Sequence, residues 1–131
     1  YALNYRTYLG TAAAYSTITM KLAGTYSFTS VTVASGSLKI TGTSGVSTII
    51  RLTEGSSNFI VSGGTLEVAQ TAINTNANVS PIFKVTGGTM KVTTVSVAAT
   101  GADGACGTIV YQEGGTTTVS GLTPKLHIQL V

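Results

Sequence analysis

The chain has 131 residues, of which only 8% are charged, and its formal net charge is +3 at pH 7. Globular domains typically carry roughly 25% charged residues, and the few basic residues here are scattered, which argues against a nucleic-acid partner. No apolar run is long enough to predict a membrane-spanning helix, and the single cysteine, Cys106, excludes an internal disulfide. A chain of this length that is rich in Gly, Ser, Thr, Ala and Val predicts one domain of strands and tight turns.

Residues 1–15 contain four of the six tyrosines and show no clear helical or strand period. We predict an N-terminal arm over 1–15, which either covers an end of the core or docks on a neighbouring subunit. A single β domain is predicted over 16–131. The sequence begins with Tyr1 rather than Met, which we interpret as a processed product and which favours export or assembly into a virion.

Apolar residues begin to alternate with polar ones after the arm. Ile18, Met20 and Leu22 show this alternation, which predicts a half-buried strand that ends at Gly24. Residues 47–53 predict another strand.

A short glycine-containing pattern then recurs four times, at residues 35–40, 63–68, 87–92 and 114–119. Within one copy, Val61 and Leu66 are an odd number of residues apart, so a straight strand would point their side chains to opposite faces. Both can reach one core only if the chain bends at the glycines, which supply the backbone conformations that a bend needs. We therefore predict structural corners at Gly36, Gly64, Gly88 and Gly115.

The copies also predict how the chain stacks. If each copy lies on the next, equivalent residues are about 4.8 Å apart. The position three residues after each corner then forms a column of Lys39, Glu67, Lys91 and Thr118, which places the carboxylate between two lysines. This favours an all-β fold, a small β-solenoid with about four rungs centred on residues 36, 64, 88 and 115, with an antiparallel β-sandwich or jelly roll as the alternative.

Two further features follow from the alignment of the copies. The polar segments 41–47, 70–80 and 98–107 are predicted loops. The fourth copy has Gln112 and Thr117 where the other copies are apolar, which is typical of a repeat at the end of a stack.

The Gly-Gly-Thr-Leu-Glu-Val pattern, repeated about once per rung over residues 29–121, resembles the β-solenoids of secreted bacterial adhesins and phage tail proteins. The resemblance is to an architecture and not to a named family. Calcium-binding nonapeptide repeats need regular aspartates, whereas this chain has only Asp103, so we expect no calcium ladder.

The sequence offers little for catalysis. His127 is the only histidine, and the acidic residues Glu54, Glu67, Asp103 and Glu113 are dispersed. Asp103–Gly107 is either a backbone nest for an anion or a tight surface loop, and Asn78 begins a formal glycosylation sequon that Pro81 follows. We expect no enzyme activity, no cofactor and no metal.

The C-terminal residues Leu126, Ile128 and Leu130 alternate with polar ones, which predicts a strand that either closes the chain's own sheet or pairs with another copy. Our hypothesis is a structural subunit that assembles with copies of itself, as an extracellular filament or a virion shell, through strand edges and terminal arms. The predicted interface joins these three residues to a partner's N-terminal arm, namely Tyr1, Leu3, Tyr5 and Tyr8.

Two other functions remain open at this point. The first is an adhesin or tail-fibre module that binds surface glycans through Tyr111 and the loops 70–80 and 98–107. The second is an ice-binding face on Thr116–Thr118, which needs the same threonine pattern on every rung, and the other copies do not repeat it.

Overall fold

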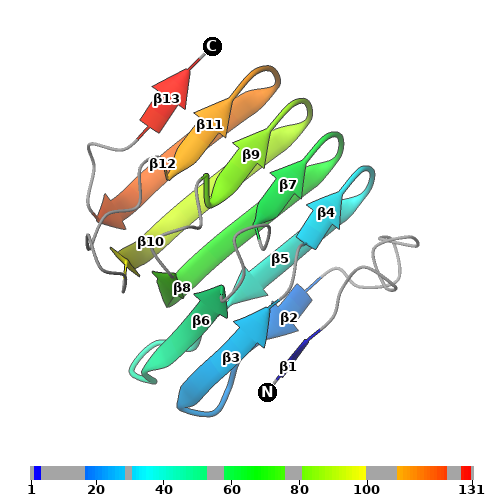
Figure 1. The fold of residues 1–131 in the computed structure, drawn as a ribbon. Coiled ribbons are helices and arrows are strands. Elements are labelled where there is room, and N and C mark those ends of the chain that lie inside the picture. The colour runs from blue at the N-terminus through cyan, green and yellow to red at the C-terminus, as the bar shows by residue number, and fades with distance from the viewer. Residues whose placement is uncertain are drawn as a thin grey trace.

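The computed structural model describes residues 2–3, 17–28, 31–52, 58–75, 81–99, 109–123 and 128–130, and the fold is that of these segments. Every regular element within them is a β-strand, and the strand pairings are all parallel. The chain winds into a β-solenoid of about three turns (Figure 1). This confirms the predicted solenoid, and the parallel pairing does not favour the antiparallel sandwich or jelly roll.

The described segments contain thirteen strands. In chain order they are β1 (Ala2–Leu3), β2 (Thr17–Thr19), β3 (Gly24–Phe28), β4 (Val31–Val33), β5 (Ser37–Thr41), β6 (Thr48–Leu52), β7 (Phe59–Val61), β8 (Thr65–Thr75), β9 (Phe83–Val85), β10 (Thr89–Ala99), β11 (Val110–Gln112), β12 (Thr116–Thr123) and β13 (Ile128–Leu130).

The strands form the three long faces of the solenoid. The first face is the sheet ordered β13-β11-β9-β7-β4. The other sheet bends within its long strands, because Gln70, Thr94 and Gly121 have positive φ angles of 55°, 52° and 77°. The second face therefore consists of β2, β5 and the N-terminal halves of β8, β10 and β12. The third face consists of β1, β3, β6 and the C-terminal halves of the same long strands.

Stacked glycines connect the first face to the second. Gly36, Gly64, Gly88 and Gly115 have φ angles of 69°, 66°, 70° and 71°. The Thr65 N–H donates to the Gly36 carbonyl at 2.8 Å, and Thr89 and Thr116 repeat this bond one and two turns later. A Cβ on Gly64 would overlap the Gly36 carbonyl oxygen, so the close stacking of the turns leaves no room for a side chain there. The four corners bound three complete turns, which is why the structure has about three turns and not four full rungs.

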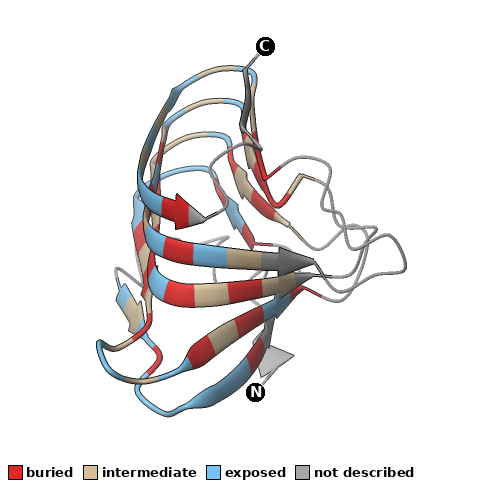
Figure 2. Ribbon diagram, turned by 90° about the vertical axis from the view of Figure 1, so that its left-hand side faces the viewer, coloured by how far each residue is buried: buried red, intermediate tan, exposed pale blue. Residues whose placement is uncertain are grey.

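The core consists of columns of equivalent apolar residues from successive turns. Val31, Phe59, Phe83 and Val110 are in register on the first face and fully buried. The rings of Phe59 and Phe83 stack with their centroids 5.2 Å apart. Buried and exposed residues alternate along the strands, as the striped colouring in Figure 2 shows. The alternation explains why a period of two in the sequence predicted these strands.

Some sequence predictions were wrong in detail. Residues 70–75 and 98–99 were expected in loops but belong to β8 and β10, and Thr41 belongs to β5. A polar residue can occupy a buried strand position here because a neighbour satisfies it. Thr71 Oγ1 accepts a hydrogen bond from Thr48 Oγ1 at 3.1 Å, and both side chains are buried.

The first predicted strand is also shorter than expected. Met20 is buried as predicted, but Leu22 is 63% exposed. The strand ends at Thr19, and the chain turns at residues 20–23 before β3 begins, which carries Leu22 away from the core. Part of the predicted arm is described, because β1 pairs with β3 through Ala2 and Leu3.

Candidate functional site

The candidate site consists of the strand edges at the two ends of the stack. β12 and β13 are outermost at the C-terminal end, whereas β2, β4 and β1 are outermost on the second, first and third faces at the N-terminal end (Figure 1). Among the described residues, no strand pairs with the outer edge of any of these five. An edge of this kind presents a row of backbone N–H and C=O groups that can template another strand.

The backbone hydrogen bonds show which groups point outward at the N-terminal end. The Met20 N–H donates to the Thr41 carbonyl at 2.8 Å, and the Val31 N–H donates to the Asn58 carbonyl at 2.9 Å, so both point into the stack. Neighbouring N–H groups along a strand point to opposite sides. The N–H groups of Thr19 in β2 and Thr32 in β4 therefore point to the outer edges.

The predicted interface residues lie at opposite ends of the molecule where they are described. Leu3 is in β1, in register with Phe28 at the N-terminal end. Ile128 and Leu130 are in β13, in register with Val110 and Gln112 at the C-terminal end. The C-terminal strand is therefore the last strand of the chain's own first face, and no described strand pairs with its other edge. Tyr1, Tyr5, Tyr8 and Leu126 lie outside the described residues.

Both ends leave core residues incompletely covered. In the column Ile18, Ile40, Val68, Val92 and Val119, the three middle residues are fully buried, whereas the two end residues are only partly buried.

The C-terminal turn also places polar side chains at core positions. Within the described segments, Thr117 Oγ1 is the one buried side-chain oxygen or nitrogen without a hydrogen-bond partner. The Gln112 side chain has a hydrogen-bond partner, since its Nε2 donates to the Gly115 carbonyl at 2.9 Å. These two residues give the last turn the polar character that the sequence indicated.

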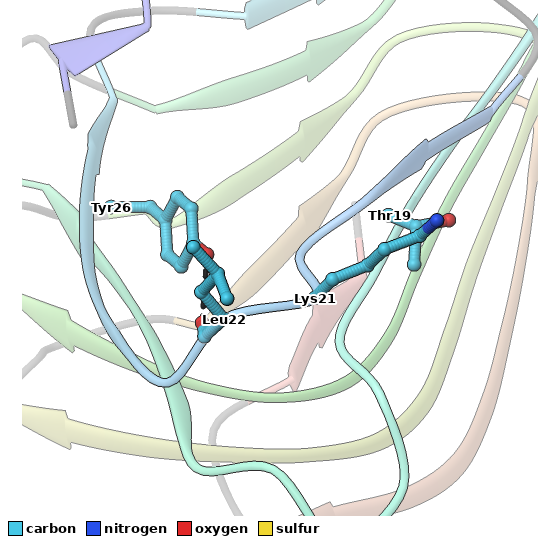
Figure 3. Close-up of a pocket in the computed structure, with 4 residues that line it drawn as sticks. All are labelled: Thr19, Lys21, Leu22 and Tyr26. Carbon is cyan, nitrogen blue, oxygen red and sulfur yellow. Dashed lines mark hydrogen bonds between the residues drawn. The ribbon is translucent and has the colours of Figure 1, made fainter.

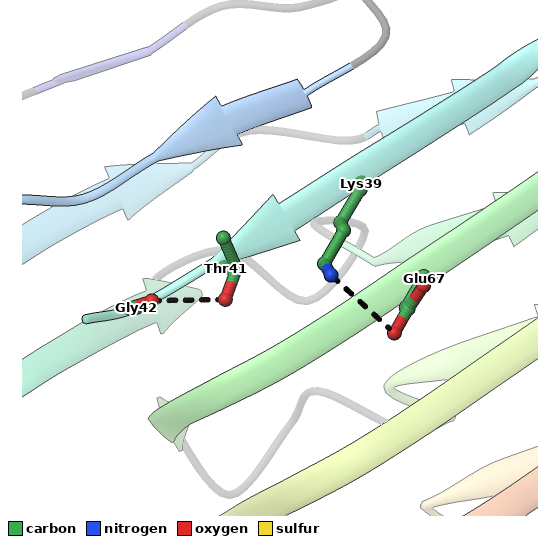
Figure 4. A network of polar contacts seen from close by, with 4 residues as sticks. All are labelled: Lys39, Thr41, Gly42 and Glu67. Carbon is green, nitrogen blue, oxygen red and sulfur yellow. Dashed lines mark hydrogen bonds and ion pairs between the residues drawn. The ribbon is translucent and has the colours of Figure 1, made fainter. Parts of the chain in front are cut away.

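Charged side chains occupy the middle of the second face. Lys39, Glu67 and Lys91 are in register on consecutive strands, as the sequence predicted. Lys39 Nζ lies 3.9 Å from Glu67 Oε2 (Figure 4). The two side chains are 44% and 27% exposed, so solvent screens the pair and its contribution to stability is about 0–1 kcal/mol.

A small hollow opens at the N-terminal end, with a volume of about 400 Å³ and a lining of Thr19, Lys21, Leu22 and Tyr26 (Figure 3). The Tyr26 hydroxyl donates to the Leu22 carbonyl at 2.7 Å, which holds the turn between β2 and β3. Lys21 is the one charged side chain among the described residues of this lining. The hollow is part of the surface at this end of the stack.

Other candidate residues from the sequence are only partly described. The described segments contain no group of three or more His, Cys, Asp or Glu residues that could hold a metal ion. These segments contain no helix that is long and apolar enough to span a membrane. Tyr111 lies partly exposed on the first face, in register with Lys84. Asn78, Asp103, Cys106 and His127 lie outside the described residues.

Comparison with protein-family models, with curated proteins and with solved structures found no match for this chain. The resemblance to adhesins and tail proteins therefore extends to the solenoid architecture alone. Sequence reasoning identified β13 but missed β2 and β4 as edge strands. The alternation Thr17-Ile18-Thr19 was the available signal for β2. The sequence did not show that β5 is its one partner among the described strands.

Proposed function

We propose that this protein is a structural subunit that polymerises by pairing strand edges at the two ends of its solenoid, outside the cell or on a virion. The observation that supports this proposal is the set of parallel-strand edges without a described partner at each end. The partner is a second copy of the same chain. Main-chain hydrogen bonds supply the attraction, and alternating side chains set the register.

The side chains at these edges favour pairing. Proteins that must avoid edge pairing place charges, prolines or bulges on their edge strands. Here the outward residues of β2 are Thr17 and Thr19, and those of the N-terminal half of β12 are Thr116, Thr118 and Ser120. All are uncharged β-formers or small hydroxyl residues. Charges appear on the second face only in the middle strands.

A proline at an outward-pointing N–H tests the proposal. Thr19→Pro removes a donor that faces the outer edge and inserts a ring there, so polymers should form only at a concentration about tenfold higher or more. The monomer keeps its bonds to β5 and should lose no more than about 1 kcal/mol of stability. Sedimentation velocity against protein concentration measures the first quantity, and urea denaturation measures the second.

The matched control is Thr19→Val, which retains the N–H and the branched shape and should polymerise as the unsubstituted chain does. Thr32→Pro and Thr32→Val repeat the comparison on β4. If the proline variants assemble as readily as the valine variants, edge pairing is not the mode of association.

A further inference from the structure

We infer that two copies join head to tail in a single register, in which β2 and β4 of one copy continue the faces that end in β12 and β13 of the copy before it. This inference rests on the proposed function and specifies the contact. It follows from the heights of the faces, from the columns of side chains and from the placement of charge.

The two ends have complementary steps. The first face is five strands high, from β4 to β13. The second face is also five strands high, through β2, β5, β8, β10 and β12. Because β4 leads into β5 and β12 leads into β13, the second face begins and ends one strand lower than the first. A shift by five strand spacings therefore fills both steps at once.

The columns of the second face continue across such a junction. β2 is in register with β5 through Thr17 with Lys39, Ile18 with Ile40, and Thr19 with Thr41. Following the same columns to the other end leads to Thr118, Val119 and Ser120 of β12. The junction would thus pair Thr118 with Thr17, Val119 with Ile18, and Ser120 with Thr19. The two partly buried core residues, Val119 and Ile18, would cover each other.

The columns of the first face independently predict the same register at the junction. Val31 of β4 and Ile128 of β13 belong to one column, which runs through Phe59, Phe83 and Val110. A five-strand shift places β4 of the next copy on β13 with Val31 opposite Ile128. No adjustment of register between the two faces is needed.

The described residues of β1 and β12 occupy different columns at this junction. β1 lies beneath β3, in register with Ser27 and Phe28, at the level that β12 of the preceding copy would occupy. The last residue of β12, Thr123, belongs to the column of Thr25, which lies before those positions along the strand. The described residues of the two strands would therefore share a layer without sharing a column.

The charges of the second face agree with a five-strand repeat. The column runs Thr17, Lys39, Glu67, Lys91 and Thr118. If the alternation of charge continued to both ends, an odd number of strands would place like charges against each other at every junction. Uncharged threonines at both ends avoid that repulsion.

Like charges placed at the two ends of this column test the register. Thr17→Glu places a carboxylate opposite Lys39 of the same chain, and Thr118→Glu places one opposite Lys91, so each single variant should fold and assemble nearly normally. The double variant brings the two carboxylates together at the junction. Each variant raises the critical concentration for assembly by some factor relative to the unsubstituted chain. At low salt, we expect the factor for the double variant to be about fivefold larger than the product of the two single-variant factors. This excess should vanish at about 1 M salt.

The matched control is the double variant Thr17→Glu with Ser120→Glu. It adds the same charge but places the carboxylates diagonally, so its excess should be clearly smaller. A second opposed pair, Thr19→Glu with Ser120→Glu, should reproduce the larger excess in the neighbouring column. Circular dichroism and urea denaturation verify that each variant is folded.

The outcomes separate the two proposals. If the unsubstituted chain shows no concentration-dependent assembly, the proposed function itself fails. If it assembles but the opposed and diagonal pairs behave alike, edge association stands and the head-to-tail register is wrong. If the diagonal pair shows the larger excess, the junction is shifted by two residues from the register inferred here.

Discussion

At the scale of single residues, the corners depend on the absence of side chains. Gly64 combines a φ of 66° with a position where a Cβ would overlap the carbonyl oxygen of Gly36 on the preceding turn. Gly45 has a φ of 79°, but a Cβ there would meet nothing within 4 Å. A side chain at Gly45 would therefore cost backbone strain alone, whereas one at Gly64 would also overlap the neighbouring turn.

We predict that Gly64→Ala lowers the free energy of unfolding by about 2–5 kcal/mol, because backbone strain and overpacking both apply. Gly45→Ala should lower it by only about 1–2 kcal/mol, from strain alone. Urea denaturation of both variants measures the difference. Equal losses would mean that the turns are not packed closely enough at the corner to exclude a methyl group.

The other bend shows what residue-level reading of the sequence missed. Gln70 and Thr94 have positive φ angles that could not be predicted from residue type, since neither is glycine. A Cβ on Gly121 would lie 3.3 Å from the Thr94 Cα, and a Cβ on Gly42 would overlap the Gln70 carbonyl oxygen. Stacking on neighbouring turns imposes this conformation, so it depends on tertiary contacts and not on local propensity.

At the scale of elements, the core holds the strands of the second face in register. The outward column of charged side chains contributes to the stability of that stacking. Glu67 lies between Lys39 and Lys91, and its one described ion pair is with Lys39. The sequence alone predicted this order of charges, because the column follows directly from the spacing of the glycine pattern.

Substitution of Glu67 tests this column. Glu67→Lys should lower the free energy of unfolding by about 1 kcal/mol at low ionic strength, because three like charges would be stacked on adjacent strands. Most of that loss should disappear at about 1 M salt, where the Debye length is about 3 Å. Glu67→Gln is the control and should cost less with little salt dependence. A Lys variant that matches the Gln variant at both salt concentrations would contradict the stacked column.

The repeated elements were largely predictable, and the connections were not. The four glycine corners and the apolar columns that include Leu38, Leu66 and Met90 follow from a period of two that breaks at each corner. The extension of β8 to Thr75 was missed, because a strand whose inward Thr71 is satisfied by Thr48 resembles a polar loop in sequence.

At the scale of the whole molecule, the solenoid has two ends and no described strand that covers them. The sequence indicated assembly through the C-terminal strand, but it could not show the equal heights of the first two faces, which depend on how the turns stack. It also placed the partner surface in the N-terminal arm, which stays a prediction, and the described edges at that end are β1, which lies in the arm, together with β2 and β4. The arm beyond β1 stays a prediction.

In the proposed polymer, copies of this chain continue one another's sheets at a fixed shift of five strands. The most direct test is the helical rise per copy in a reconstruction of assembled protein by cryo-electron microscopy. The proposal predicts a rise of about 24 Å, five spacings of about 4.8 Å, with strands continuous across each junction. Filaments with a different rise, or particles that stay monomeric at every concentration, would contradict it.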